Sequence, residues 1–231
     1  MIAITIPCWN QLQYTTWCVE SIIRNSGSHD VRFAFIDNGS TDGTYEFLAS
    51  KNPARLIRNE RNMGVSYAWN QGLYAALELK PDVVVLLNND VIVGPRWLDP
   101  VVRELQKPEK RYFLPNGNIG KPETFDKDVL AALPSLSGVT PARAGWCLFF
   151  TASAVKTFLP IPNELFLWFG DDYIHYKLQK AGYKCLALLE CCCFHFVSRT
   201  FYATHNYDKI VHEDKAHFDR IIKEEEEKEK N

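Results

Sequence analysis

Short apolar runs and longer amphipathic stretches alternate along the first part of the chain. The apolar runs predict buried strands, and each of them ends in a polar or turn-forming segment. They lie at Ile2–Ile6, Val31–Ile36, Ala54–Arg58 and Val83–Leu87. Between them, apolar residues recur at spacings of three and four, which predicts helices. These helices are expected from Tyr14 to about Asn25, from Thr41 to Ala49 with Ser40 or Thr41 as N-cap, and over Ser66–Leu79. Alternating strands and helices indicate an α/β fold with a mostly parallel central sheet flanked by helices.

The later part of the chain is less regular. Residues 107–143 are rich in Pro, Gly, Asn and charged residues, which predicts a long excursion over the active face. Strands are expected at Leu148–Thr151 and Lys184–Leu189, on either side of a helix from about Asp172 to Lys180. Near the end, one helical face carries Ile210, Val211, Phe218, Ile221 and Ile222, and a charged tail from Glu224 to Lys230 is expected to fray.

Composition narrows the class of protein. The chain has 231 residues, of which 46% are hydrophobic, and its net charge is −2. A core of ordinary size is therefore possible, and nothing in the total charge indicates a nucleic-acid partner. The seven cysteines form no paired framework, the start of the chain lacks the pattern of a secretory signal, and the apolar run Val83–Leu87 is too short to cross a bilayer. We expect a cytoplasmic protein with free thiols.

Polar clusters follow three of the predicted strands. Because ligands of open α/β sheets bind outside the carboxyl ends of the strands, these clusters are the candidate site. The first holds Pro7, Trp9 and Asn10, which alone is typical of a simple strand-to-helix loop. The second begins with Asp37, Asn38 and Gly39. It fits a capped Asx turn and also a carboxylate placed to bind a nucleoside, and the two interpretations are compatible.

The third cluster is Asn88-Asn89-Asp90. Two amides and a carboxylate at the end of a buried apolar strand pack poorly but bind oxygen groups or a cation well. A hard divalent ion prefers oxygen ligands and often completes its shell with substrate phosphates. For Asn88 and Asn89, a strand-end turn remains an equal alternative.

The order of these segments resembles glycosyltransferase family 2, which has the GT-A fold. The resemblance rests on IDNGSTDGT, NMGVSYAWNQGL and LLNNDV, followed by Gly145-Trp146-Cys147-Leu148, then Phe169-Gly170-Asp171-Asp172-Tyr173, and His195 with Ser198 and Thr200. It implies a GT-A domain over residues 1–203, with a nucleotide-sugar half at 1–92, a smaller acceptor half at 93–203, and a C-terminal helix with a charged tail at 204–231. The activity it implies is inverting, non-processive transfer of one sugar from a nucleoside-diphosphate sugar, with a UDP-sugar as the commonest donor in the family.

The resemblance also implies roles for the site residues. Asp37 would contact the nucleoside, and Asn62, Gly64 and Asn70 match a segment beside the nucleotide. Gly64 would equally suit a turn, and Asn70 a buried backbone contact. Asp90, with Asn88 in a position where many relatives have Asp, would bind a divalent metal that holds the diphosphate.

Asp171 and Asp172 match the paired acids of the family. Two adjacent carboxylates repel each other, so one pKa should rise and favour a base. The resemblance implies that Asp172 is the base, and we expect Asp171 to cap the helix. The structural alternative is that both residues are caps.

His195 matches a late metal-binding segment, although a histidine between two phenylalanines also suits a core. An imidazole beside oxygen ligands favours Mn²⁺ over Mg²⁺. The adjacent Cys191–Cys193 have no second cysteine pair for a zinc site, so we interpret them as small buried strand residues. Trp146 and Trp168 suit either a sugar-stacking surface or the core.

The sequence leaves the identity of the acceptor open. A glycan or lipid-linked glycan is the family default, and a protein, a metabolite or a hydroxymethylated DNA base is an alternative. Five basic residues suit either a phosphate-rich acceptor or a solvated surface: Lys107, Lys110, Arg111, Lys121 and Arg143. A sugar-phosphate nucleotidyltransferase would need a Gly-rich basic loop after the first strand, which is absent. A non-catalytic nucleotide-sugar-binding relative is the other alternative, for which Asn88 speaks mildly.

Overall fold

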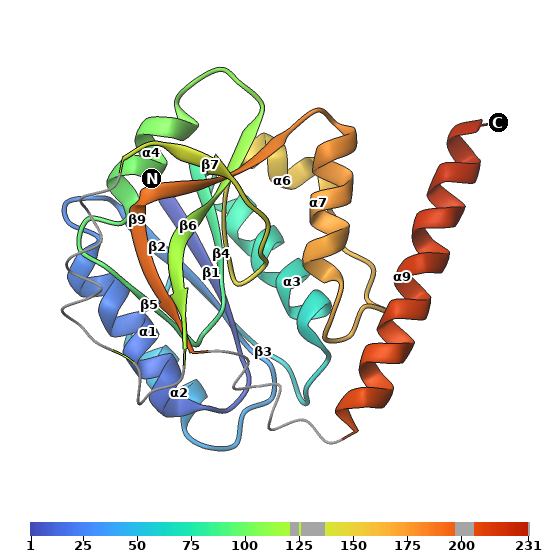
Figure 1. Ribbon diagram of the computed structural model, residues 1–231. Coiled ribbons are helices and arrows are strands. Elements are labelled where there is room, and N and C mark those ends of the chain that lie inside the picture. The colour runs from blue at the N-terminus through green and yellow to red at the C-terminus, as the bar shows by residue number, and fades with distance from the viewer. Residues whose placement is uncertain (121–124, 126–136, 197–205, 231) are drawn as a thin grey trace.

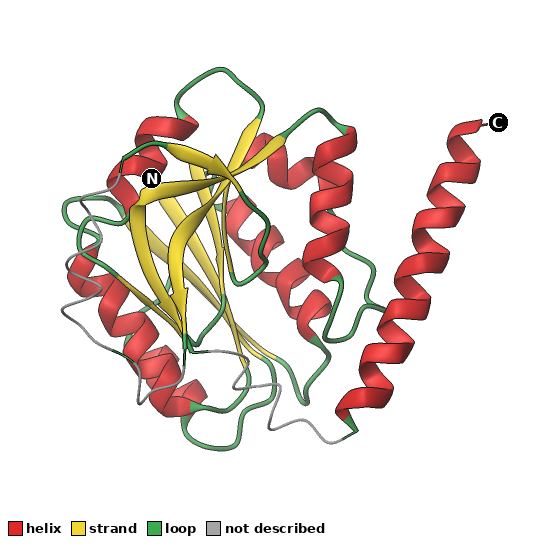
Figure 2. Cartoon of the chain, in the orientation of Figure 1, coloured by secondary structure: helices red, strands yellow, loops and turns green. Residues whose placement is uncertain are grey.

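A computed structural model describes residues 1–120, 125, 137–196 and 206–230 of the chain (Figure 1). The strands are β1 (Ile2–Cys8), β2 (Val31–Asp37), β3 (Arg55–Arg58), β4 (Val83–Leu87), β5 (Val91–Val93), β6 (Arg111–Ile119), β7 (Val139–Pro141), β8 (Cys147–Thr151) and β9 (Lys184–His195). The helices are α1 (Leu12–Asn25), α2 (Thr44–Ser50), α3 (Val65–Glu78), α4 (Leu98–Leu105), α6 (Ala152–Phe158), α7 (Gly170–Lys180) and α9 (Tyr207–Lys230). The strands form one central sheet with helices on both faces (Figure 2).

The first part of the sheet is parallel. Strands β3, β2, β1 and β4 lie side by side in that order, and β1 pairs with both β2 and β4. All four predicted strands and the three helices between them are confirmed to within a few residues at their ends. The apolar runs succeed as a guide here because both faces of these strands are covered, which leaves β4 buried along its whole length.

The second part of the sheet is mixed. Strand β8 is antiparallel to β4 and to β6, β6 is parallel to β9, and β5 and β7 are antiparallel to β9. The prediction of a surface excursion over residues 107–143 is wrong for β6, whose Tyr112, Phe113 and Leu114 are buried. The second half of β6 contains Pro115, Asn116 and Gly117, and the register with β9 shifts between Pro115 and Asn116. These turn-forming residues in a strand hid it from a pattern-based analysis. Residues 121–124 and 126–136 of the excursion lie outside the described residues.

Two buried clusters lie on opposite faces of the sheet. Helices α1, α2 and α4 supply one cluster, with Ile22, Leu48 and Trp97 among its members. Helices α3, α6 and α7 supply the other, which includes Leu73, Phe158 and Ile174. Figure 1 shows the corresponding arrangement, with α1, α2 and α4 to one side and α3, α6 and α7 to the other. The site described below lies at the edge where strands β1, β2 and β4 end.

Helix α9 packs outside α7 as an additional layer (Figure 1). Phe218, Ile221 and Ile222 face the second cluster, as their spacing predicts. The charged tail does not fray from Glu224, because the helix continues to Lys230. Glu225 anchors this part by accepting hydrogen bonds from Tyr173 and Lys177 of α7.

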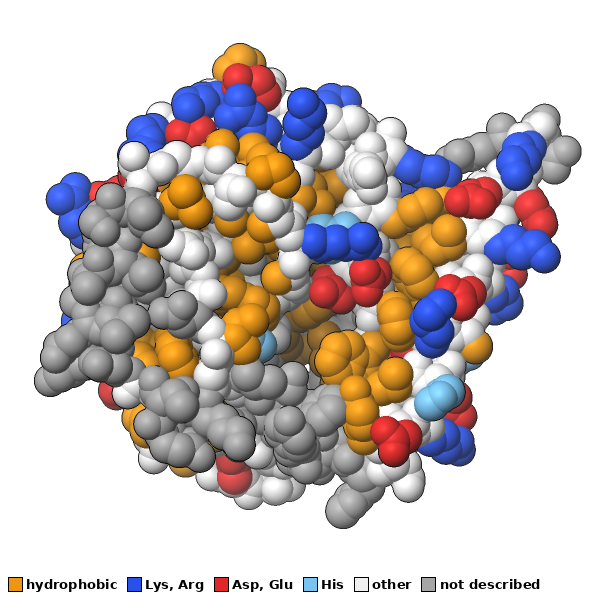
Figure 3. Space-filling model, viewed as in Figure 1, with side chains coloured by type: hydrophobic (Ala, Val, Ile, Leu, Met, Phe, Trp, Pro, Cys, Tyr) orange, Lys and Arg blue, Asp and Glu red, His pale blue; other side chains and the backbone are white. Residues whose placement is uncertain are grey.

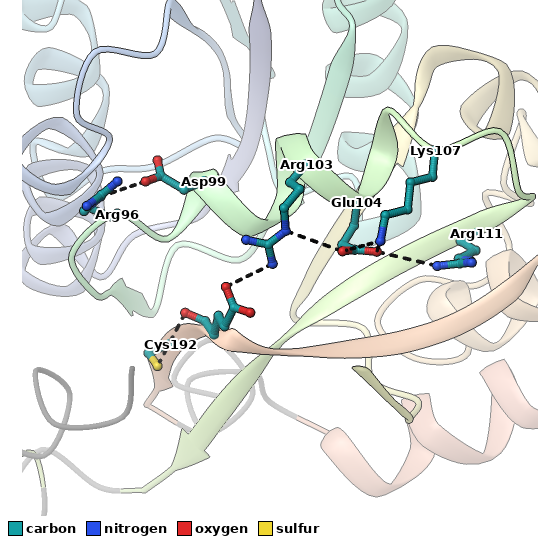
Figure 4. A network of polar contacts seen from close by, with 8 residues as sticks. Arg96, Asp99, Arg103, Glu104, Lys107, Arg111 and Cys192 are labelled. Atoms are coloured by element: carbon teal, nitrogen blue, oxygen red, sulfur yellow. Dashed lines mark hydrogen bonds and ion pairs between the residues drawn. The ribbon is translucent and has the colours of Figure 1, made fainter. Parts of the chain in front are cut away.

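A charge cluster joins α4 to the strands β6 and β9 (Figure 4). Glu104 is buried and lies within 3.5 Å of cationic nitrogens of Arg103, Lys107 and Arg111, and Arg103 also contacts Glu190. These cations lower the pKa of Glu104, although its burial opposes them. Lys107 and Arg111 are therefore engaged in local pairs, as expected for surface residues with a structural role. Lys121 lies outside the described residues.

The described helices include none that combines the length and the apolar composition needed to cross a membrane. All seven cysteines are free thiols, as predicted. Cys191–Cys193 are buried within β9, which confirms their interpretation as strand residues. Among the described residues, no group of three or more His, Cys, Asp or Glu side chains that could hold a metal is found.

Candidate active site

A pocket of about 230 Å³ lies at the carboxyl ends of the parallel strands, between the two halves of the chain. Its lining residues come from the strand-end loops, from the start of α3 and α7, and from the segment before α7. They are Pro7, Cys8, Trp9, Asn38, Asn62, Gly64, Val65, Trp69, Asn88, Asn89, Asp90, Gly145, Trp146, Phe166, Leu167, Trp168, Asp171 and His195. Figure 3 shows this face with a hollow among hydrophobic side chains and a group of acidic and basic side chains at its margin.

The first loop carries Pro7, Trp9 and Asn10. Pro7 and Trp9 line the pocket, whereas Asn10 is used to join two loops. The Asn10 backbone N–H donates to Ser40 Oγ at 2.8 Å, and its side-chain oxygen accepts from the Thr41 N–H at 2.8 Å. Because Ser40 and Thr41 are engaged in this way, neither is the N-cap of α2. That prediction is wrong, since α2 begins at Thr44 after Gly43.

Asp37 is fully buried at the end of β2 and does not line the pocket. Its carboxylate accepts from the Ser40 N–H at 3.2 Å and lies 3.3 Å from Arg58 Nε. Burial raises the pKa of Asp37, and the contacts with Ser40 and Arg58 oppose that rise. In this arrangement the carboxylate fixes the loop that follows β2.

Asn38 organises the neighbouring loop from inside the pocket wall. Its amide donates to Asn62 Oδ1 at 2.8 Å and to the Gly64 carbonyl at 3.2 Å. Its oxygen accepts from Asn59 at 2.9 Å and from the Met63 N–H at 3.0 Å. The amides of Asn38 and Asn62 are thus both held in fixed orientations. Gly39, the next residue, has a φ of 83° and supports the turn.

Gly64 lies in close contact with Phe166 of the second half. Its φ is 93°, and an added Cβ would lie 2.7 Å from the Phe166 ring and 2.8 Å from the Phe166 carbonyl oxygen. The adjacent Val65 N–H donates to that same carbonyl at 2.6 Å. Only glycine can adopt this backbone conformation in the available space.

Asn70 lies within α3 and does not line the pocket. Its side chain donates to the Ile161 carbonyl at 2.7 Å and accepts from the Ile161 N–H at 2.8 Å. It also donates to Asn163 at 3.0 Å. These contacts match the alternative of a buried backbone contact.

The segment after β4 places Asn88 and Asp90 on the pocket, with Asn89 between them. Asn89 donates to Thr15 Oγ1 at 2.9 Å, which anchors the segment to α1. Asp90 Oδ1 lies 3.1 Å from His195 Nε2, at the end of β9. The indole of Trp146 stacks on the His195 ring with a centroid distance of 5.2 Å.

This pair has the chemistry of a metal site. Neither ring nitrogen of His195 has a hydrogen-bond partner among the described residues, although both are buried. A buried imidazole without such partners beside a carboxylate fits a divalent cation bound between them. Asp90 and His195 could supply two ligands to such a cation, and the Asn88 amide oxygen could supply a third. The remaining positions would be left for oxygen atoms of a substrate.

Helix α7 presents the two adjacent acids differently. Asp171 lines the pocket and packs against Gly145, where an added Cβ would lie 2.3 Å from the Asp171 carboxylate. Burial raises the pKa of Asp171, and the neighbouring Asp172 adds to that rise. Asp172 does not line the pocket. Its side chain, next in sequence to the pocket-lining Asp171 and here called the pocket margin, is 37% exposed and accepts a hydrogen bond from Arg143 at 2.7 Å.

The expectation that Asp171 caps α7 is wrong. The N-cap is Phe169, which has a φ of 64° and makes no side-chain capping bond. Gly170 therefore occupies the first helical position, and the acids follow within the first turn, where negative charge is favoured by the helix dipole. Neither acid is therefore the N-cap residue of α7.

His175, one turn further along α7, contacts the backbone next to the pocket-lining residues Gly145 and Trp146. One of its ring nitrogens contacts the Ala144 carbonyl at 3.2 Å, and the other contacts the Tyr112 hydroxyl. Burial lowers the pKa of His175 to about 4, and Arg143 adds to that effect. The neutral imidazole thus fixes the backbone just before Gly145 and Trp146.

Sequence reasoning missed one part of the lining. Val65, Trp69, Phe166 and Leu167 were not among the candidate residues, and the last two belong to an irregular segment with no polar signal. Trp146 and Trp168, which suited either of two roles, both line the pocket. Residues 93–230 thus contribute more apolar surface to the pocket than the polar motifs of the sequence predict.

Comparisons with known proteins agree with this geometry. The sequence model described as "Glycosyl transferase family 2" matches residues 3–137, which is more than half of the chain. The curated protein "Glycosyltransferase GlyG" of Streptococcus pneumoniae serotype 4 is 24% identical over 180 residues, or 72% of this chain. The chain spans 58% of that relative's length.

Solved structures share the fold, which is that of GT-A glycosyltransferases. The structure of GalNAc-T7 with UDP, GalNAc and Mn²⁺ has a TM-score of 0.68 at 17% identity, covering 84% of this chain and 43% of that one. The mannosyltransferase PcManGT of Pyrobaculum calidifontis, in complex with GDP-Man and Mn²⁺, has a TM-score of 0.65 at 20% identity, covering 87% and 58%. TarS of S. aureus with UDP has a TM-score of 0.68 at 14% identity, covering 85% and 60%.

Proposed function

Since the chain belongs to glycosyl transferase family 2, we propose that it transfers one sugar from a nucleoside-diphosphate sugar to an acceptor hydroxyl, with inversion at the anomeric carbon. One observation carries the proposal: a single pocket joins Asp90 and His195 to Asp171, with Asp172 at its margin. These groups come from both halves of the chain. They provide a cation site for a diphosphate and a pair of acids facing it.

The donor occupies the enclosed part of the pocket in this proposal. The loops of Asn38, Asn62 and Asn88–Asp90 face its nucleoside diphosphate, and Pro7 and Trp9 complete that wall. A UDP-sugar is our first candidate donor. Asp90 and His195, with Asn88, would hold a divalent metal, preferably Mn²⁺, which would offset the negative charge that develops on the departing diphosphate.

We assign different roles to the two acids of α7. An acceptor must arrive from solvent, and Asp172 is the acid that faces solvent at the pocket margin. Asp172 would take the proton of the acceptor hydroxyl as its oxygen attacks the anomeric carbon. The bond between that carbon and the diphosphate oxygen breaks, and the electron pair leaves with the nucleoside diphosphate. Asp171, buried in the pocket with a raised pKa, would hold the donor sugar by hydrogen bonds.

Trp146 and Trp168 supply apolar surface at the pocket for the sugars. A glycan or lipid-linked glycan is the proposed acceptor class. Arg143, the described basic residue at the margin, is paired with Asp172, so a phosphate-rich acceptor such as DNA has no clear advantage there.

The proposal is tested by measuring nucleoside diphosphate release from a panel of sugar nucleotides, with Mn²⁺, with Mg²⁺ and with a chelator. We expect release from one donor that requires the metal and is faster with Mn²⁺. With an acceptor present, Asp172→Asn should reduce transfer by about 10²–10⁴-fold, the usual contribution of a general base.

Asp171→Asn is the matched variant. It should raise the KM for the donor, and it should retain more turnover than Asp172→Asn. The reverse ranking would reassign the base to Asp171. Failure of every donor to release product, together with a failure to bind any nucleoside diphosphate in the presence of metal, would exclude the catalytic proposal. Binding without release would support the non-catalytic alternative.

A further inference from the structure

Helix α9 contains one acid that points inward. Asp214 is 2% exposed, and its carboxylate accepts three backbone N–H groups. Oδ1 accepts from Phe166 at 3.0 Å, and Oδ2 accepts from Leu167 at 2.7 Å and from Trp168 at 2.8 Å. Asp214 lies four residues after Ile210 and four before Phe218, on the apolar face of the helix. A carboxylate in that position requires buried partners, and here the partners are consecutive amides.

The three amides belong to the wall of the pocket. Phe166, Leu167 and Trp168 all line it. On the opposite side of this segment, the Phe166 carbonyl accepts from Val65 at 2.6 Å. Phe166 is thus held from both directions, by Asp214 of α9 and by the start of α3.

The same segment leads directly into the two acids. Phe169 follows Trp168 and adopts the left-handed conformation from which α7 begins. Its ring stacks on Phe218 of α9 with a centroid distance of 5.5 Å. Further back, His217 contacts the Glu164 carbonyl at 3.1 Å. Helix α9 therefore fixes the chain before, within and after the pocket-lining segment.

Loss of the carboxylate would affect this segment directly. Hydrogen bonds to an ionised acceptor are stronger than neutral ones, and a buried N–H without a partner is costly. Without Asp214, three adjacent amides would have to find other partners, and the segment would relax. An error of about 1 Å in the position of a catalytic group can reduce turnover by about 100-fold.

We propose that Asp214 is a positioning residue for sugar transfer: it fixes the segment 166–168, and through Phe169 it sets the orientation of Asp171 and Asp172 in the pocket. This inference rests on the proposed function. It makes α9, which lies beyond the residues matched by the family model, a working part of the site.

The test compares Asp214→Asn with Asp219→Asn. Asparagine keeps the size of the side chain but places an N–H₂ group against backbone N–H donors. Asp219 lies on the same helix, is exposed, and pairs only locally with Lys215, so its variant controls for the change in charge. Asp214→Glu tests whether a carboxylate on a longer stem restores function.

Four quantities are measured below the midpoint temperature of unfolding: kcat and KM for nucleoside diphosphate release, Kd for the nucleoside diphosphate alone, and the rate of hydrogen exchange of residues 166–168. For Asp214→Asn we expect kcat to fall by about 10–100-fold, with Kd for the nucleoside diphosphate changed less than about threefold and with faster exchange of the three amides. Asp219→Asn should match the parent chain, and Asp214→Glu should recover part of kcat.

Equal kcat in folded Asp214→Asn and in the parent would overturn the inference. So would a parallel loss of kcat and nucleotide affinity, which would indicate general disruption. If Asp214→Asn and Asp214→Ser both fail to fold where the parent is folded, the residue is structural and the inference is also wrong. A parent chain that neither binds nor turns over any sugar nucleotide would instead exclude the proposed function itself, whatever the exchange measurements show.

Discussion

The two halves of the sheet build their share of the pocket in different ways. In residues 1–92, parallel strands end at one edge, and the loops that follow them carry Asn38 and Asn88–Asp90. In residues 93–230, the sheet is mixed, and part of the pocket wall comes from a segment without regular structure, residues 166–168. That segment is held by contacts with residues far away in sequence, Val65 and Asp214.

This difference indicates which part of the pocket can vary in its substrate specificity. The first half is held by parallel strands and by hydrogen bonds between its loops and helices, such as those of Asn38 with Asn62 and of Asn89 with Thr15. The second half depends on long-range contacts, which place an apolar wall and two acids against the first half. A change in α9 therefore acts on the pocket through the 166–168 segment, which also contacts Gly64 and Val65 of the first half.

The largest expected effect comes from removing the proposed cation site of the first half. Asp90→Asn should reduce metal-dependent release by two to three orders of magnitude, or about 3–4 kcal/mol of transition-state stabilisation. When activity is titrated against Mn²⁺, the variant should need a higher metal concentration for half-maximal activity. A change in thermal stability alone should not account for the loss. Asp219→Asn, at an exposed acid of α9 outside the pocket, is the charge-matched control. Unchanged metal dependence in Asp90→Asn would remove Asp90 from the site.

The contact between the halves should give the next effect. Gly64→Ala forces a Cβ to within 2.7 Å of the Phe166 ring at a φ of 93°. We expect a loss of about 2–3 kcal/mol in the free energy of unfolding, from backbone strain and overpacking together. Gly182→Ala is the matched control, because Gly182 has a φ of 83° with open space around it. That variant should lose about 1 kcal/mol from backbone strain alone, and denaturant unfolding of both checks the difference.

Low pH should lower the free energy of unfolding through His175, which lies in the second half. Its folded pKa of about 4 lies below the ordinary value of 6.5, so the unfolded chain binds the proton first. This contribution is complete above about pH 6.5 and is lost as the pH falls toward 4. Between pH 7 and pH 5 it amounts to about 2 kcal/mol. In His175→Gln the decline over this range should be smaller by that amount, as measured by denaturant unfolding at both pH values. Identical slopes would contradict the assignment of a neutral buried imidazole.

The smallest effect is expected at the pocket margin. Arg143 is 58% exposed and Asp172 is 37% exposed, so their ion pair is screened by water. Arg143→Gln should change the free energy of unfolding by no more than about 0.5 kcal/mol. Thermal unfolding in low and high salt would check this, since the parent and variant should converge as salt increases. A larger loss would show that Arg143 holds the second half together.

Much of the first half was predictable because its strands and the polar motifs after them can be recognised within short stretches of sequence. Apolar runs such as Val83–Leu87 mark strands covered on both faces, and the polar residues just after them fall at the binding edge. Pro7, Trp9, Asn38, Asn62, Gly64 and Asn88–Asp90 were identified in this way or by the family resemblance, and all line the pocket. Their individual functions stay predictions until the variants are measured.

Other assignments depended on tertiary contacts. The sequence could not show that Ser40 is engaged by Asn10, so the cap of α2 was misplaced. It also could not show that β6 continues through Pro115 and Gly117, because pairing with β9 overrides the turn-forming residues. The positions of Asp171 inside the pocket and Asp172 at its margin follow from the start of α7 at Gly170, which Phe169 determines.

By itself, then, the sequence determined the strands and helices of the parallel first half and the family, since these follow from apolar periodicity and short motifs. Only the tertiary structure decided which acid enters the pocket, which apolar residues line it and what holds them. The physical reason is the range of the interactions. Strand-end loops directly follow apolar runs that are visible in the sequence, whereas the 166–168 segment is positioned by a carboxylate 46 to 48 residues further along the chain, whose partners no local pattern reveals.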